Sequence, residues 1–226
     1  MRRSVLLASA VAAAGLLAAC SSMGTGSGSG MGGSSGMSFF VTSQGSGRGA
    51  DFGGIEGADR LCNSLASAAG STKVWRAYLS TQPVGSRAGS NARDRIGTGP
   101  WRNAQGVVVA SSVADLHGPN NNITKQTALT EKGETVKGRG DQPNQHDVLT
   151  GTQPDGTSIA GEVDTTCGNW TKSGEGAAMV GHHDRTGLDE SAPAKSWNSS
   201  HQSRGCGVEA LKTTGGDGRL YCFATN

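Results

Sequence analysis

Apolar and polar positions repeat with a clear period in two stretches of the first half of the chain. In the first stretch, small and apolar residues fall at i, i+3, i+4, i+7 and i+11, which is one face of a helix: Ala58, Leu61, Cys62, Leu65 and Ala69. Gly70 follows at the position where a helix commonly ends. The pattern therefore predicts a helix whose buried face includes Cys62.

The second periodic stretch, residues 74–80, alternates as a half-buried strand does. Its alternation points Trp75 and Leu79 toward the core and Arg76 and Tyr78 away from it. Further strands are predicted at residues 39–42, 107–110 and 218–223, with residues 101–106 as the first arm and turn of a hairpin. From residue 111 to residue 216 regular periodicity is nearly absent. We therefore expect an α+β domain with a loop-rich second half.

The first twenty residues have the pattern of an export signal. Arg2 and Arg3 precede an apolar run, which the tetrapeptide Leu-Ala-Ala-Cys closes at Cys20. The run from residue 4 to residue 19 has 16 residues, fewer than the roughly 20 that a membrane-spanning helix needs. The tetrapeptide resembles the lipobox of bacterial lipoproteins, which implies removal of residues 1–19 and acylation of Cys20. The alternative is a plain signal peptide in which the cysteine occurs by chance.

A flexible tether is predicted between this signal and the folded domain. Residues 21–37 include thirteen glycines and serines in seventeen positions, a composition typical of a flexible coil. Ser21 resembles the sorting residue of outer-membrane lipoproteins. The membrane is thus the first expected partner, through a lipid anchor at Cys20 in the outer membrane, on the cell surface or on the periplasmic face. Residues 20–37 form the anchor and tether, and residues 38–226 the domain.

The charge balance excludes one class of partner. The chain has 20 Lys and Arg against 18 Asp and Glu, and loss of Arg2 and Arg3 with the signal leaves 18 against 18. Binding to nucleic acid phosphates needs a clustered excess of basic residues. We therefore expect no nucleic acid partner.

Four cysteines remain for the domain once Cys20 is assigned to the anchor: Cys62, Cys167, Cys206 and Cys222. In an exported domain an even number of cysteines favours disulfides, here two, and the spacing leaves all three pairings open. Zinc ligation by these thiols is disfavoured, because the closest pair is 16 positions apart rather than in a C-x2-C motif.

Several segments carry a family resemblance along nearly the whole domain. They are residues 39–42, 54–62, 75–80, 146–151, 155–156, 166–171 and 219–223. In this order they resemble the landmarks of endostatin-like domains and of the bacterial surface lipoproteins built on them, including leptospiral endostatin-like outer-membrane proteins. The match is weak between residues 119 and 145.

The resemblance implies a C-type-lectin-like fold, with two helices, a twisted antiparallel sheet, long loops and nested disulfides. The outer bridge would be Cys62–Cys222 and the inner one Cys167–Cys206. Loops of 160 and 39 residues would then be closed, and the chain-entropy model assigns such closures roughly 5 and 4 kcal/mol. Such bridges would supply much of the stability of a glycine-rich domain with few aromatic residues.

A calcium site is one candidate for function. Gln153, Pro154 and Asp155 form a tripeptide that resembles a calcium-binding motif of C-type lectins, and Glu162 and Asn198 follow in a similar order. Their oxygen atoms are the ligands that calcium requires. Ser199 departs from the lectin pattern, which has Asp there, and endostatin-like domains have no such site at the matching turn. The alternative is an ordinary β-turn, with proline at its second position.

Two groups of polar residues near the end of the domain are further candidates. Trp197, Asn198, His201 and Arg204 combine an aromatic face with amide, imidazole and guanidinium groups, as sugar-binding sites do; the alternative for Trp197 is a place in the core. The second group comprises His182, His183 and Asp184, with His146–Asp147 in the same half of the chain. Such residues bind ligand, hold a metal, brace a loop or act as acid and base. On an extended chain, at most one of the adjacent histidines faces a given ligand.

No nucleophile elbow, phosphate-binding loop, H-E-x-x-H motif or dinucleotide fingerprint occurs in the sequence. We therefore expect a non-catalytic binding module of the cell envelope, which recognises a glycan or an extracellular-matrix-type protein. The alternatives are a structural lipoprotein that contacts peptidoglycan or another envelope component and, third, a metal-dependent enzyme. Beyond calcium, no cofactor is expected.

Overall fold

The last strand, β8 (Gly216–Ala224), is the centre of the sheet in the computed structural model, which describes residues 36–225. Two strands pair antiparallel with the end of β8: β1 (Phe39–Val41) and β2 (Trp75–Ala77). Both pair with Cys222 and Phe223 of β8. The first half of β8 pairs parallel with β5 (Asp147–Leu149). Strands β6 (Met179–His182) and β7 (His201–Gln202) extend the sheet, in the order β1-β8-β5-β6-β7.

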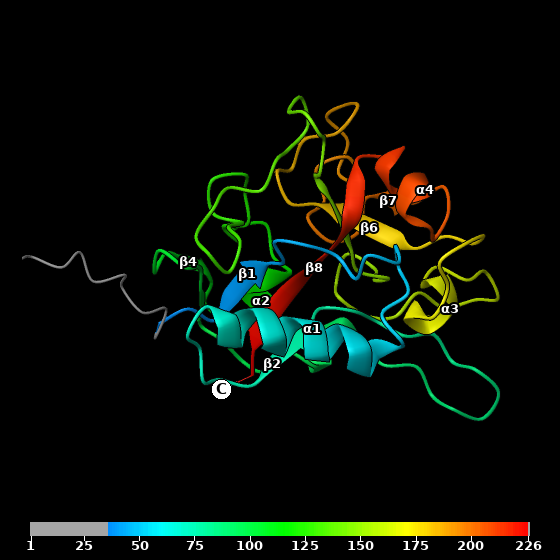
Figure 1. Cartoon of the computed structure of the whole chain (residues 1–226), viewed down its shortest axis with the longest axis horizontal. Coiled ribbons are helices and arrows are strands. Elements are labelled where there is room, and N and C mark those ends of the chain that lie inside the picture. The colour runs from blue at the N-terminus through cyan, green and yellow to red at the C-terminus, as the bar shows by residue number, and fades with distance from the viewer. Residues whose placement is uncertain (1–35, 226) are drawn as a thin grey trace, which may run out of the picture. The chain divides into compact units, whose positions relative to one another are not determined.

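The expected helix is present as α1 (Ile55–Ala68), which packs on β2 and β8 (Figure 1). Ala58, Cys62 and Ala66 are its buried apolar residues, whereas Leu61 and Leu65 are only half-buried. The helix therefore presents its small side chains to the sheet, which allows a close approach. The remaining α-helices of the described residues have four or five residues each: α2 (Val113–Leu116), α3 (Cys167–Trp170) and α4 (Val208–Lys212).

The mixed α+β architecture agrees with the expectation, and two details correct it. The sheet is not purely antiparallel, because β5 lies parallel to β8 after a long crossover. The described residues contain one long helix and three short helical segments rather than two helices. The four residues of α3 have positive φ, so this segment is a left-handed turn. The predicted hairpin is confirmed as β3 (Trp101–Arg102) and β4 (Val108–Ala110), and a short 3-10 helix (Ala92–Asp94) precedes it.

Both faces of the sheet are covered, which corrects the prediction for Tyr78. Phe40, Trp75 and Cys222 lie in the core under α1. Tyr78, instead of pointing outward, is fully buried in a second core, where its ring contacts those of Trp197 and Phe223. Strand β2 ends at Ala77, and the loops that follow cover this face of the sheet.

Two disulfides join distant parts of the chain, in the pairing that the resemblance implies. Cys62 of α1 is bonded to Cys222 of β8, and Cys167 of α3 is bonded to Cys206. In each bridge the Cα atoms are 5.7 Å apart, which is the ordinary spacing. The first bridge fixes the helix on the central strand.

The expected signal peptide and lipidated Cys20 lie outside the described residues, as does most of the tether. Met37, at the expected end of the tether, is buried in the core under α1, so the folded part starts before residue 38. No helix among residues 36–225 is long and apolar enough to cross a membrane.

A buried carboxylate on α1 holds the helix to its neighbours. Asp59 Oδ1 accepts from the backbone N–H of Ala77 at 2.9 Å and from Arg95 at 2.7 Å. Its Oδ2 accepts from Arg76 at 2.7 Å. Every oxygen of this carboxylate thus has a donor, so the charge is compensated although the side chain is only 7% exposed.

We expect Asp59→Asn to destabilise the fold by about 3 kcal/mol, because it leaves two guanidinium groups without their carboxylate. Chemical denaturation monitored by circular dichroism measures this. Asp51→Asn is the matched control, since Asp51 pairs with Arg48 at the surface, and its denaturation midpoint should not move. Equal effects of the two substitutions would contradict the structural role of Asp59.

Candidate metal centre

Strands β5, β6 and β7 bring three histidines and one aspartate to one place in the sheet. Asp147 on β5 lies directly opposite His182 on β6. His201 on β7 lies opposite Val180, two residues before His182, and so faces the same side. His146 comes just before β5, where the pairing with β8 shifts register, and its ring stacks on that of His182 at 4.2 Å.

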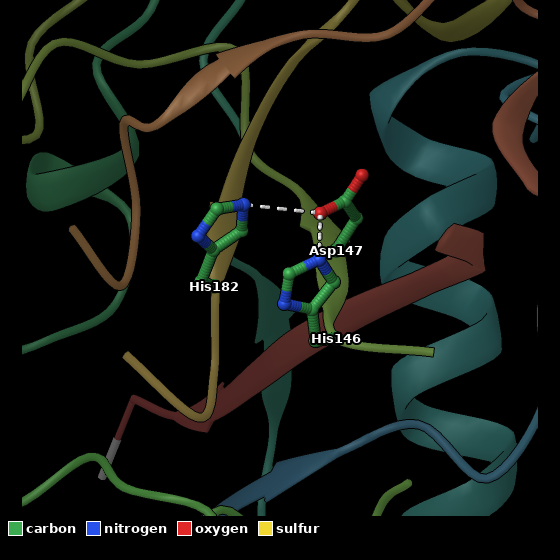
Figure 2. A group of neighbouring side chains, drawn as sticks. All are labelled: His146, Asp147 and His182. Atoms are coloured by element: carbon green, nitrogen blue, oxygen red, sulfur yellow. Dashed lines mark ion pairs between the residues drawn. The ribbon is translucent and has the colours of Figure 1, made fainter. Parts of the chain in front are cut away.

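The three imidazoles surround a single oxygen atom. Asp147 Oδ1 lies 3.2 Å from Nε2 of His146, 3.3 Å from Nε2 of His182 and 3.5 Å from Nε2 of His201. Figure 2 shows the first two contacts, with His146 and His182 converging on the carboxylate. The side chains of Asp147, His146 and His182 are buried, and that of His201 is 37% exposed.

The other ring nitrogen of each histidine is already engaged. Nδ1 of His146 lies 3.3 Å from a carboxylate oxygen of Asp184. Nδ1 of His182 lies 2.8 Å from the Ala194 carbonyl, and Nδ1 of His201 lies 3.0 Å from the Gln202 carbonyl. Because these oxygens only accept hydrogen bonds, each Nδ1 donates, and in a neutral ring the lone pair is then on Nε2. Metal-binding histidines in proteins are oriented in this way.

This arrangement needs a positive charge at its centre. Lone pairs on Nε2 that face a carboxylate oxygen repel it unless a proton or a cation lies between them. Among the described residues, His182 Nε2 and both carboxylate oxygens of Asp147 have no hydrogen-bond partner. Burial raises the pKa of Asp147, but His182 and His201 outweigh burial and hold that pKa below its ordinary value. Asp147 in turn raises the pKa of His201.

The carboxylate–imidazole distances suit ligands of a shared metal ion. The ligand atoms of His146, Asp147 and His182 all lie within 4.8 Å of one another, whereas His201 lies outside this group. Zinc bonds to nitrogen and oxygen at about 2.0–2.1 Å, which places the ligand atoms of a tetrahedron about 3.3–3.4 Å apart. The three distances from Asp147 Oδ1 are 3.2, 3.3 and 3.5 Å. Imidazole and carboxylate together suit zinc, whereas calcium takes oxygen ligands. The rings of His146 and His182 are within 12° of parallel, so a shared ion requires them to rotate.

The histidines also form part of the wall of an open pocket of about 660 Å³. His146, His182 and His201 line it together with residues of the loops before β5, before and after β7, and after α4. Its size is in the range of small-ligand sites. The cluster is therefore open to solvent on the side of His201.

Only some of the predicted ligand-binding residues lie at this pocket. His201 and Arg204 line it. Asp184 does not line the pocket; its side chain is 2% exposed and contacts Nδ1 of His146. The other three candidates correct the prediction of a sugar-binding surface, because they are buried in the described domain: His183, Trp197 and Asn198.

Trp197 and Asn198 are occupied by the protein itself. The Trp197 ring contacts the rings of Tyr78 and Tyr221, with centroids 4.9 and 5.2 Å away. Because the residue is only 4% exposed, its ring is not accessible to a sugar. Asn198 Nδ2 donates to the Pro154 carbonyl at 3.1 Å and to the Tyr78 hydroxyl at 3.0 Å. These residues form the second core and hold the loops that cover it.

The expected calcium ligands do not form a site. Gln153 and Asp155 belong to a β-turn, in which the Asp155 carboxylate accepts from the Thr157 N–H and hydroxyl. Asn198 presents its amide nitrogen rather than its oxygen to this turn. Glu162 is exposed and, within residues 36–225, has no hydrogen bond to the other three. A proline turn satisfied by its own neighbours leaves no set of free oxygens for calcium.

The sequence indicated the histidines and Asp147 as candidates for a metal site but did not show which of them meet at the centre. The rule that adjacent histidines face opposite sides holds, since His182 faces Asp147 while His183 Nε2 lies 3.2 Å from the Lys137 carbonyl. The rule alone does not say which of the two faces the cluster. The pairing of β5 with β6 decides it.

Burial of His183 predicts a loss of stability in acid. Burial lowers the pKa of His183 to about 4, from the ordinary histidine value of about 6.5. As the pH falls, His183 takes up a proton in the unfolded chain at a higher pH than in the folded one. The free energy of unfolding should therefore decrease by about 3 kcal/mol between pH 7 and pH 4. The measurement is urea denaturation across this range in EDTA. His183→Gln should flatten the profile relative to the wild type; parallel profiles would contradict the assignment.

Comparison with models of known protein families gives no match for this chain, and comparison with curated proteins finds no similar one.

Proposed function

We propose that residues 36–225 form a zinc-dependent binding domain, in which His146, Asp147, His182 and His201 hold Zn²⁺ beside the open pocket. One observation carries the proposal: three Nε2 atoms surround Asp147 Oδ1 while each Nδ1 is engaged elsewhere. A divalent ion removes the repulsion among these groups. It also compensates a buried carboxylate that otherwise has no donor in the described chain.

The first role of the ion is to stabilise the folded domain. Its ligands come from three neighbouring strands, β5, β6 and β7, all of which have only two to four residues. Such short strands hold few backbone hydrogen bonds, so a metal that binds the folded form alone stabilises their pairing. The proposed centre thus cross-links β5, β6 and β7, as the Cys62–Cys222 bridge cross-links α1 and β8.

The pocket gives the domain its binding role. Four protein ligands complete a tetrahedral zinc site, which is the arrangement of structural centres, whereas catalytic centres keep one position for water. We therefore assign the pocket to recognition rather than hydrolysis. The most exposed ligand is His201, so a bound molecule reaches the centre from its side.

For the cellular location and the class of ligand, the proposal relies on the sequence. The lipobox and tether support a lipoprotein of the outer membrane, whose domain binds a glycan or an extracellular-matrix-type protein. The nested disulfides support a C-type-lectin-like, endostatin-like fold, as does the pairing of β1 with β8, which brings the two ends of the domain together. The pocket at the metal centre replaces the Gln153–Asn198 region as the proposed recognition site.

We expect the metal-free protein to bind one equivalent of Zn²⁺, measured by equilibrium dialysis with elemental analysis. Co²⁺ in place of zinc should give the visible absorption of a tetrahedral site. His182→Ala should abolish binding because it removes a buried ligand. His183→Gln is the matched control, since the neighbouring His183 side chain points away, and it should bind zinc as the wild type does.

Two results would overturn the proposal. The first is a folded wild-type protein that binds no zinc. The second is zinc binding that survives in His182→Ala, which would place the ion elsewhere. Circular dichroism of each variant shows that loss of zinc is not loss of folding.

A further inference from the structure

We infer that the pocket beside the His146–His182–His201 centre binds an oxyanion, a carboxylate or phosphate carried by a hydroxylated ligand such as an acidic sugar. This inference rests on the proposed zinc site and adds the chemical class of the ligand. It is carried by the charges that line the pocket and by the way in which the backbone holds them.

The lining of the pocket is positively charged. Arg139, Arg204 and Lys212 line it against a single carboxylate, that of Asp189. Within residues 36–225, the guanidinium groups of Arg139 and Arg204 have no ion-pair partner, whereas the Lys212 ammonium contacts Glu209 at 2.9 Å. The whole chain is nearly neutral, with a formal charge of +2. The excess at the pocket is therefore local, and it favours an anion.

Arg139 is connected to the metal centre through one carboxylate. Its backbone N–H donates to Asp184 Oδ2 at 2.6 Å, and Asp184 Oδ1 lies 3.3 Å from His146 Nδ1. Gly138 allows this close approach, because a Cβ there would lie 2.6 Å from Asp184 Oδ2. Asp184 thus positions both the imidazole of His146, a proposed zinc ligand, and the backbone of Arg139, which lines the pocket.

The backbone is also fixed on the side of Arg204. The hydroxyl of the preceding Ser203 accepts from the Ala178 N–H at 3.0 Å and donates to the Gly205 carbonyl at 2.8 Å. Cys206, two residues further on, is bonded to Cys167. Hydrogen bonds or a disulfide thus restrain the backbone near both arginines, so less conformational freedom is lost when an anion binds at the pocket.

The neutral lining indicates a hydroxylated ligand. Hydroxyl and amide side chains fill much of the wall: Asn144, Ser191, Ser200, Gln202, Thr213 and Thr214. Such groups exchange hydrogen bonds with sugar hydroxyls. The only large exposed apolar side chain at the pocket is Leu188, which is 88% exposed within the described chain. Charge attraction and hydrogen bonds, rather than apolar burial, thus select the ligand.

The test uses three sugars that share a ring and differ in one group. The zinc-loaded protein is titrated calorimetrically with glucuronate, glucose 6-phosphate and glucose at fixed ionic strength. We expect at least one of the two anionic sugars to bind at least tenfold more tightly than glucose. The better of the two identifies carboxylate or phosphate as the preferred group.

The arginines are tested by paired substitutions. Arg139→Gln with Arg204→Gln should weaken binding of the better anion at least tenfold and leave the zinc stoichiometry unchanged. Arg60→Gln with Arg87→Gln is the matched control: it removes the same charge from residues that do not line the pocket. This control should keep the wild-type affinity.

The inference is overturned if glucose binds as tightly as both anions, if none of the three sugars binds, or if the control pair weakens binding as much as the pocket pair. Zinc content is measured first by dialysis, independently of the sugars. A protein that binds zinc but no anion refutes this inference alone, whereas a protein that binds no zinc refutes the proposed function.

Discussion

The hydrogen bonding of β8 is the constraint on which the rest of the structure depends. This strand pairs with β1, β2 and β5 along its length, and its Cys222 is bonded to Cys62 of α1. It therefore holds the start of the domain, the long helix and the loop-rich half against one another. Because β5 lies beside β8, and β6 and β7 follow β5, the position of the histidine cluster also depends on this strand.

Two buried aspartates show how a structural charge differs from a functional one. Asp59 accepts from two arginines and a backbone N–H, so the protein itself compensates it. Asp147 is equally buried, but its neighbours are imidazole nitrogens whose other ring nitrogen already donates elsewhere. The first arrangement is complete within the folded chain. The second is complete only with a cation or protons, which is why we place the functional centre there.

The aromatic and polar residues near Trp197 illustrate how one composition serves two purposes. Tryptophan beside asparagine suits both a sugar-binding surface and a hydrogen-bonded core. Here Trp197 is buried against Tyr78 and Tyr221, and the Asn198 amide donates to the Pro154 carbonyl of the turn. With about 4% aromatic residues, the chain buries all of its Phe, Trp and Tyr rings in two cores. The recognition that we propose therefore relies on the charged and hydroxyl groups at the pocket.

The sequence by itself determined the face of α1, the first and last strands and the hairpin at Trp101, because each has a local period or a turn signal long enough to read. The even number of cysteines predicted two bridges, and the family resemblance supplied their pairing. Only the tertiary structure decided that His182 rather than His183 joins Asp147, and that Tyr78 lies inside. Strands of two to four residues are too short to show alternation, and residues 146, 182 and 201 meet only through the register of β5, β6 and β7.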